Sequence, residues 1–109
     1  MSRNFSQTIT VRCVDPAPIV ELIAEWDLMQ ATSDIMGYMG TRVLADRETP
    51  GQYVIIADFG VVDPNVSAAE EADRNNARPE TRAWAARLLE LIEGEPEYHH
   101  FDVIYRTDR

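Results

Sequence analysis

Two adjacent histidines, His99 and His100, are the only histidines in the sequence, and they lie in the stretch GEPEYHHFDVIYR near its end. Imidazole titrates near neutral pH, so either ring suits general acid–base chemistry, and a neutral ring can also ligate a metal ion. Successive side chains on an extended strand point to opposite faces, so the two rings cannot converge on one ion. We therefore expect no metal site here.

The parity of the last predicted strand, 97–106, assigns the two rings to different faces. If Phe59, at the end of the predicted hairpin, faces the helices, the apolar residues Ile9 and Val11 of the first predicted strand should face them too. Phe101 of the last strand then joins this apolar set, and His99 shares its parity. We therefore predict that His99 lies beside an apolar cavity between sheet and helices, where it could act as a general base. The alternative is a core or rim histidine that hydrogen-bonds the backbone.

His100 falls in the opposite parity set, which is polar. Such a face suits paired hydrogen bonds across a subunit interface, or a polar catalytic pocket in which His100 would be the titrating group. The members of this set are Thr10, Arg12, Arg42, Asp58, His100 and Asp102.

Three elements that would position these residues can be recognised in the first sixty residues. Alternating polar and apolar residues over 6–14 predict a strand. A helix is predicted over 15–33 from its apolar spacing, with Asp15 as its N-cap. The segment 37–60 reads as two strands joined by a turn at Pro50-Gly51. The second of these strands is apolar on both faces, so it should be covered on both.

Two helices and a strand are predicted in the rest of the chain. A short polar helix should begin at Ser67, and a longer one should follow Pro79 and end near Gly94. The order is then β-α-β-β-α-β, an α+β ferredoxin-like fold with an antiparallel four-stranded sheet and helices on one face, in a single domain spanning 1–109. Because two helices cover only one face of the sheet, we expect a second copy to cover the other, giving a homodimer.

Composition excludes several classes of function. A net charge of -9 disfavours nucleic acid as a partner. The single cysteine, Cys13, allows no internal disulfide and no cysteine-rich zinc site, which fits a cytoplasmic protein. No apolar run approaches the roughly 18 residues that suggest a membrane span, and the opening MSRNFSQTIT lacks a secretory core, so we expect no membrane association.

The predicted layout, together with GYMGTRVLADRETPGQYVIIADF, resembles the antibiotic biosynthesis monooxygenase family of dimeric α+β barrels. The resemblance covers nearly the whole chain and is most specific in the hairpin, where Gly37 and Gly40 lead one strand and Phe59 ends the other. It implies a homodimer with sheets face to face. It also implies oxygenation of a polycyclic aromatic substrate, such as an anthrone or quinol, without metal, flavin or other cofactor.

The resemblance also bears on the ligand site. Trp26 and Trp84 lie on predicted helix stripes that face the sheet, and with Tyr53 and Phe59 they could line a flat apolar slot for a small aromatic ligand; the alternative is that the tryptophans are core residues. Phe59 stands where the family commonly has tryptophan and cannot donate an indole N–H. A non-oxidative binding protein, isomerase or lyase of the same fold is therefore an alternative. Members of similar fold that degrade haem ligate its iron with a histidine on a helix in the second half of the chain. The helices predicted there contain no histidine, so haem degradation is disfavoured.

Overall fold

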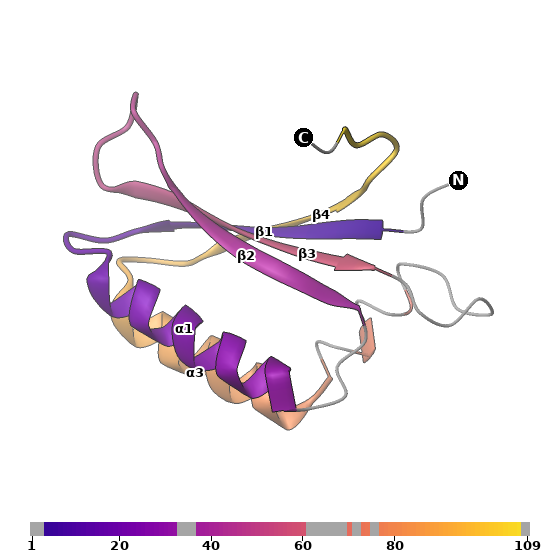
Figure 1. The fold of residues 1–109 in the computed structure, drawn as a ribbon. Coiled ribbons are helices and arrows are strands. Elements are labelled where there is room, and N and C mark those ends of the chain that lie inside the picture. Colours follow the sequence, from indigo (N-terminus) through magenta and orange to yellow (C-terminus); the bar gives the residue numbers. More distant parts are fainter. Residues whose placement is uncertain (1–3, 33–36, 61–69, 71–72, 75–76, 108–109) are drawn as a thin grey trace.

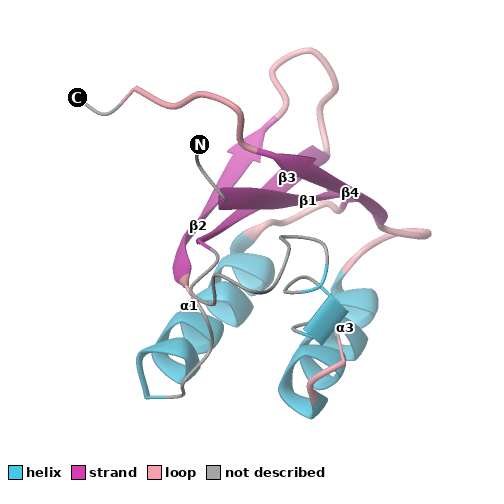
Figure 2. Cartoon of the chain, turned by 90° about the vertical axis from the view of Figure 1, so that its right-hand side faces the viewer, coloured by secondary structure: helices cyan, strands magenta, loops and turns pink. Residues whose placement is uncertain are grey.

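The computed structural model describes residues 4–32, 37–60, 70, 73–74 and 77–107 of the chain. Four strands form one antiparallel sheet in the order β2-β3-β1-β4. Both helices lie on one face of it (Figure 1), side by side (Figure 2), which confirms the predicted ferredoxin-like α+β fold. In chain order the elements are β1 (Asn4–Arg12), α1 (Ala17–Thr32), β2 (Tyr38–Ala45), β3 (Gln52–Gly60), α3 (Pro79–Leu91) and β4 (Glu97–Asp102).

The core lies between the sheet and the helices. Odd-numbered residues of β1 and β3 point into it, and the predicted stripe of α1, Ile19, Ile23 and Trp26, is buried against them. Leu88 is the buried contact of α3. Burial also raises the pKa of the Cys13 thiol, whose neighbours Asp15 and Glu93 act in the same direction. The buried cluster contains Ile9, Val11, Cys13, Ile19, Leu22, Ile23, Ile55 and Leu88.

Both α1 and α3 begin beside residues that typically start helices. A side-chain oxygen of Asp15 accepts a hydrogen bond from the backbone N–H of Ala17 at 3.0 Å, just ahead of the first turn of α1. Pro79 occupies the first turn of α3, where its missing N–H costs nothing. An exposed ion pair between Arg87 of α3 and Glu25 of α1, at 2.6 Å, joins the two helices.

The hairpin between β2 and β3 is held by one carboxylate. Asp46 accepts hydrogen bonds from the backbone N–H groups of Glu48 and Thr49 and from the side chain of Gln52. The Asp46 N–H in turn donates to the Gln52 carbonyl at 3.0 Å, which closes the ladder. Gly51 supplies the positive φ, 86°, that the turn requires. The predicted turn at Pro50-Gly51 is therefore confirmed.

The start of β2 contains a close backbone contact and a bulge. Gly37 lies so close to the end of β3 that a Cβ there would be 1.7 Å from the Gly60 carbonyl oxygen, and the Gly60 N–H donates to the Gly37 carbonyl at 2.7 Å. Tyr38 pairs with Phe59 and Gly40 with Asp58, so Met39 is an extra residue on β2. As a result Tyr38 points to the helix side of the sheet, as Thr41 does.

One predicted strand ends earlier in the structure, and the start of one predicted helix lies outside the described residues. The last strand ends at Asp102 rather than at 106: the Val103 N–H still donates to Asn4, where β1 begins, and the chain then leaves the sheet. The helix predicted to begin at Ser67 starts outside the described residues. Among the described residues, no helix combines the length and apolar character needed to cross a membrane.

The sheet surface turned away from the helices is called the open face below. The hairpin turn and the segment after β4 both rise on this side of the sheet (Figure 1). Leu44 and Phe101 are exposed on it, and Val54 and Ile56 are half-buried. By strand register, the open face carries Thr10, Arg12, Arg42, Leu44, Val54, Ile56, Asp58, His99 and Phe101.

Candidate functional site

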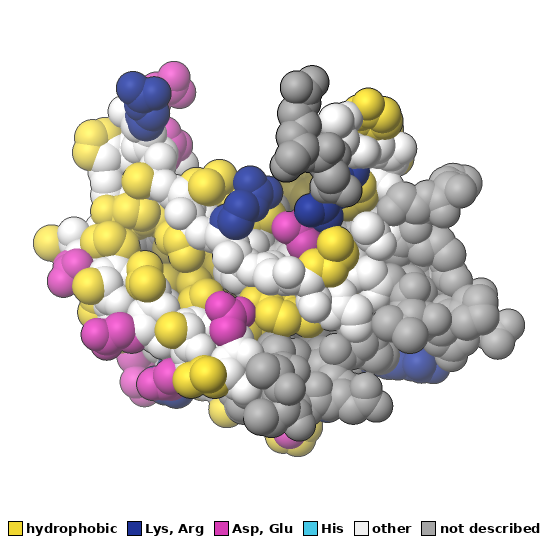
Figure 3. All heavy atoms as spheres, in the orientation of Figure 1, with side chains coloured by type: hydrophobic (Ala, Val, Ile, Leu, Met, Phe, Trp, Pro, Cys, Tyr) yellow, Lys and Arg dark blue, Asp and Glu magenta, His cyan; other side chains and the backbone are white. Residues whose placement is uncertain are grey.

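A cavity of about 320 Å³ lies between the sheet and the two helices. Its volume is at the lower end of the range of about 300–1,000 Å³ typical of small-molecule sites. Hydrophobic side chains cover much of the surface on the side of the molecule where α1 and β2 meet (Figure 3). The residues lining the cavity are Gln7, Ile9, Ile23, Trp26, Thr41, Ile55, Ala57, Phe59, Thr81, Arg82, Trp84, Ala85, Tyr98 and His100.

Aromatic rings from three elements form much of the cavity wall. Trp26 of α1 and Trp84 of α3 have ring centroids 5.9 Å apart and planes inclined by 54°. Phe59 of β3 stacks on Phe5 at 5.0 Å and meets Tyr38 at 5.6 Å. Edge-on and offset contacts of this kind hold the rings in fixed orientations. The structure thus brings together three of the four predicted binding residues, Trp26, Phe59 and Trp84.

Tyr53, the fourth, does not line the cavity. It pairs with Val11 at the other end of β3 and packs against the hydrophobic core cluster. It is six positions from Phe59 along the extended chain, a span of roughly 20 Å. Shared parity puts both rings on the same face of the sheet, but the length of the strand keeps Tyr53 away from the cavity.

The prediction that His99 lies beside the cavity is wrong, because each histidine lies on the face of the sheet that was predicted for the other. In the ladder between β1 and β4, His100 pairs with Gln7 and His99 with Thr8. His100 therefore lies on the helix side, where it lines the cavity while remaining solvent-exposed, at its edge. His99 lies on the open face, where its Nε2 is 3.1 Å from Glu97 Oε1 and its ring stacks on Phe101.

The other residues of the predicted polar set also lie on two different faces of the sheet. Arg12, Arg42 and Asp58 do lie on the open face, as expected, and the Asp58 carboxylate accepts a hydrogen bond from the Ser6 hydroxyl. Asp102 belongs with His100 on the helix side, since it pairs with Phe5. Within the described ranges, no three or more His, Cys, Asp or Glu side chains gather as a metal site would require.

Two buried polar atoms on residues that line the cavity have no hydrogen-bond partner within the described part of the chain. They are the indole Nε1 of Trp84 and the hydroxyl Oγ1 of Thr81, one turn apart on α3. A buried polar group without a partner costs about 1–3 kcal/mol, so such groups are rare in folded proteins unless a ligand or water pairs with them. The Trp84 N–H can only donate a hydrogen bond.

A hydrogen-bonded group beside the cavity was not predicted from the sequence. Tyr38 donates a hydrogen bond to the Asp27 carboxylate of α1, and its hydroxyl also bonds that of Thr41, which lines the cavity. In an unbroken strand, Tyr38 and Thr41 would point to opposite faces, and only the bulge at Met39 brings them together. The available signal was Gly40, whose φ is 140°, inside an otherwise β-rich run.

No family model matches the sequence, and no curated protein does. Solved structures do match. A variant of SnoaB from Streptomyces nogalater, described as a cofactor-independent oxygenase, aligns with a TM-score of 0.71 and 18% identity over 99% of this chain and 100% of its own. A second SnoaB structure gives 0.63 and 22% over 97% and 96%.

A protein from Nitrosomonas europaea, provisionally described as an antibiotic biosynthesis monooxygenase, aligns with a TM-score of 0.66 and 10% identity over 99% of this chain and 97% of its own. These structural neighbours are antibiotic biosynthesis monooxygenase proteins, so the resemblance expected from the sequence is confirmed at the level of the fold. At these identities the shared property is the fold, since function depends on the site built on it.

Proposed function

We propose that this chain is a cofactor-independent monooxygenase that acts on a small polycyclic aromatic molecule of the anthrone or quinol type. The observation that carries the proposal is the cavity, in which aromatic rings from both helices and the sheet surround a space with one imidazole, His100, at its edge. A flat ligand can stack on such walls, and the apolar lining would exclude water. The fold shared with SnoaB, itself described as a cofactor-independent oxygenase, supports the same chemistry.

His100 is the group best placed to start the reaction. As a general base it would take a proton from the substrate, leaving an electron-rich carbanion or phenolate that can donate electrons to O₂. For an anthrone, a new C–O bond forms to one oxygen atom, and the resulting hydroperoxide loses water as its O–O bond breaks and the second C–H proton leaves. One O₂ is consumed, one oxygen atom enters the new carbonyl group and the other leaves as water.

The test is oxygen uptake by protein free of metal and flavin, with a panel of anthrones and hydroquinones, and ¹⁸O₂ labelling of the product. His100→Ala should lower kcat by about 10²- to 10⁴-fold, the usual contribution of a general base. His99→Ala is the matched control and should leave turnover unchanged, because His99 lies on the other face. Absence of uptake with the whole panel, or equal losses in the two variants, would contradict the proposal.

A non-oxidative role in the same cavity is the second candidate. It is favoured by Phe59, which offers no N–H donor where the family resemblance leads one to expect tryptophan. The indole donor in this cavity comes instead from Trp84 on α3. Thermal-shift measurements separate the two functions: a ligand that raises Tm and is recovered unchanged under oxygen supports binding without oxidation.

We also infer that the chain forms an obligate homodimer through its open face. Leu44 and Phe101 on that face are 43% and 53% exposed, and Ile104 and Tyr105, in the segment that rises beside it, are 91% and 81% exposed. Burying these side chains against a second copy would stabilise the pair by roughly 25 cal/mol per Å² of apolar surface removed from water. A two-fold arrangement would also let Arg42 pair with acidic groups of the partner.

Leu44→Asp tests the dimer, with Leu89→Asp as the matched control. Both leucines are exposed to a similar degree, 43% and 50%, but Leu89 lies on α3, away from the open face. Light scattering at micromolar concentration should show a dimer for the wild type and for Leu89→Asp, and monomer or aggregate for Leu44→Asp. A stable, folded wild-type monomer at that concentration would refute the inference.

A further inference from the structure

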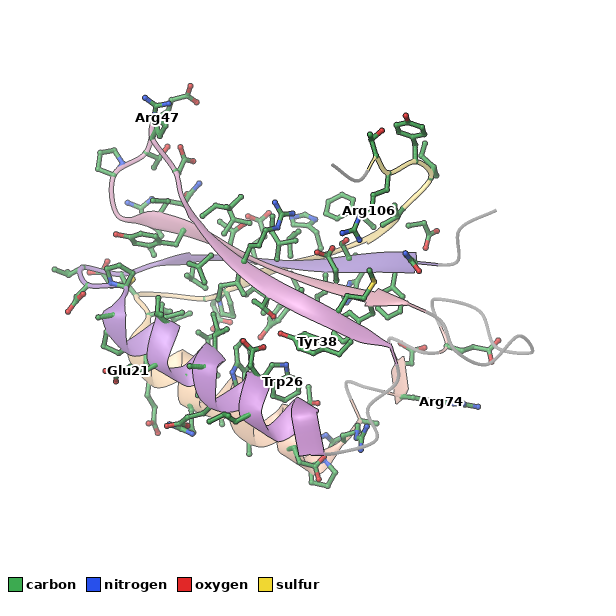
Figure 4. The ribbon with its side chains drawn as sticks, in the orientation of Figure 1. Glu21, Trp26, Tyr38, Arg47, Arg74 and Arg106 are labelled. Carbon is green, nitrogen blue, oxygen red and sulfur yellow. The ribbon has the colours of Figure 1, made fainter. Side chains whose placement is uncertain are left out.

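A line of three hydrogen-bonded side chains leads from the cavity to the protein surface. Thr41 lines the cavity, Tyr38 lies next to it beneath β2, and Asp27 is exposed on α1. Figure 4 shows Tyr38 on the helix side of β2, above the Trp26 side chain. The Tyr38 ring is fixed by its contact with Phe59, at a centroid distance of 5.6 Å. Its hydroxyl therefore has a defined position between Asp27 and Thr41.

The directions of the two hydrogen bonds follow from proton counting. A carboxylate oxygen can only accept, so the single hydroxyl proton of Tyr38 is donated to Asp27. The bond between Tyr38 and Thr41 must then use the proton of Thr41, since the Tyr38 oxygen has only lone pairs left. Burial, followed by the hydrogen bond to Asp27, raises the pKa of Tyr38 to about 12, so the phenol keeps its proton at neutral pH.

This arrangement determines what Thr41 can offer to a ligand. A threonine hydroxyl usually rotates to donate or accept as its surroundings require. Here its proton is committed to Tyr38, so a ligand group that reaches this hydroxyl from the cavity meets lone pairs only. The Trp84 N–H in the same cavity has the opposite character, because it can only donate and has no partner among the described residues. The residues that line the cavity therefore include one hydroxyl held as an acceptor, on Thr41, and one buried N–H that can only donate, on Trp84.

We propose that Thr41 determines ligand specificity by accepting a hydrogen bond from a free hydroxyl group of the ligand, with Tyr38 and Asp27 as the positioning residues that hold it in the accepting state. The ligand class is then a small aromatic that carries a phenolic or enolic hydroxyl. This inference rests on the proposed function only in using the same cavity, and it concerns binding rather than oxidation.

The test compares two ligands that differ in one proton donor, 2-hydroxyanthraquinone and 2-methoxyanthraquinone. Both carry carbonyl acceptors and both are already oxidised, so calorimetric titration measures binding without turnover. Wild-type protein should bind the hydroxy compound at least about 10-fold more tightly, because the methoxy compound leaves the part-buried Thr41 acceptor unpaired. Thr41→Ser should keep that preference, whereas Thr41→Val should lose it through weaker binding of the hydroxy compound.

Tyr38→Phe is the decisive variant, since it keeps the ring but frees the proton of Thr41. The freed hydroxyl can donate to the methoxy oxygen, so the preference should fall to within about 3-fold, mainly through tighter binding of the methoxy compound. Loss of structure alone would weaken both ligands together. Tyr53→Phe removes a hydroxyl outside the cavity and is the matched control, which should keep the wild-type preference.

Three results would overturn the inference: equal binding of the two ligands by the wild type, an unchanged preference in Tyr38→Phe, or no binding of either ligand, since the ligand class would then be wrong. The outcome is independent of oxygenation. A protein that shows the preference but consumes no oxygen would refute the proposed monooxygenase activity and leave the specificity of the cavity standing. A protein that oxidises anthrones but binds the two ligands equally would support the monooxygenase activity and refute the role of Thr41.

Discussion

Gly37→Ala is expected to destabilise the protein more than Gly94→Ala, although both glycines have a left-handed backbone, with φ of 61° and 69°. Placing alanine in that conformation costs about 1–2 kcal/mol at either position. The two sites differ in their surroundings. A Cβ on Gly94 would meet nothing within 4 Å, whereas a Cβ on Gly37 would be 1.7 Å from the Gly60 carbonyl oxygen, roughly 2 Å short of an ordinary contact.

Relieving that clash requires the start of β2 to move away from the end of β3. The 2.7 Å hydrogen bond from the Gly60 N–H to the Gly37 carbonyl would then be lost, at a cost of about 0.5–1.5 kcal/mol. We therefore expect a loss of about 1–2 kcal/mol for Gly94→Ala and about 1.5–3.5 kcal/mol for Gly37→Ala. Because Tyr38 follows Gly37 directly, the same shift should also disturb the contact between Tyr38 and Thr41.

Urea unfolding of both variants measures the difference, at one fixed protein concentration so that association affects each sample equally. Equal losses in the two variants would show that the backbone conformation alone matters, and would refute the reasoning from the close contact. A larger loss in Gly94→Ala would contradict it further, since that site has open space around it.

Three further outcomes are expected. Leu88→Ala should lower the free energy of unfolding by about 2–5 kcal/mol in urea titrations, because Leu88 is fully buried in the core of the fold. Thr81→Val should raise it by about 1 kcal/mol in the absence of ligand, since it removes a buried hydroxyl that has no partner; a loss would show that the hydroxyl is satisfied. The free energy of unfolding should hold up to about pH 10 and fall as the pH rises towards 12. Burial raises the pKa of Tyr38 from 10.0 to about 12 in the folded protein, so this tyrosine ionises first in the unfolded chain. Unfolding measured as a function of pH should lack this part of the decline in Tyr38→Phe.

The fold could be predicted from local patterns because they agree with one another. Alternation over β1, the apolar spacing of Ile19, Ile23 and Trp26, and the turn at Pro50-Gly51 each define an element without reference to distant residues. These elements have only a few ways to cover one sheet face, so their order leads to the ferredoxin-like arrangement. Trp26 and Trp84 could be predicted to face the cavity for the same reason, since helix periodicity determines which side of a helix faces the sheet.

Which face of the sheet each residue of β4 occupies could not be predicted in this way. All six of its residues are exposed, and both parity sets contain an aromatic residue, Tyr98 in one and Phe101 in the other. Apolar alternation therefore gives no preference, and the face of each histidine depends on the register with β1, a pairing between opposite ends of the chain. The bulge at Met39 could not be located for a related reason: Gly40 signals an irregularity in the strand, but an extra residue is defined only by comparison with the partner strand.

The alternation along β3 has an evolutionary consequence. Ile55, Ala57 and Phe59 line the cavity, while Val54, Ile56 and Asp58 on the same strand belong to the open face. Substitutions at odd positions therefore alter the shape of the ligand space, and those at even positions alter the opposite surface. One stretch of six residues can thus be under two separate selective pressures, and a lineage can acquire a new ligand preference there without changing the side chains of the other face.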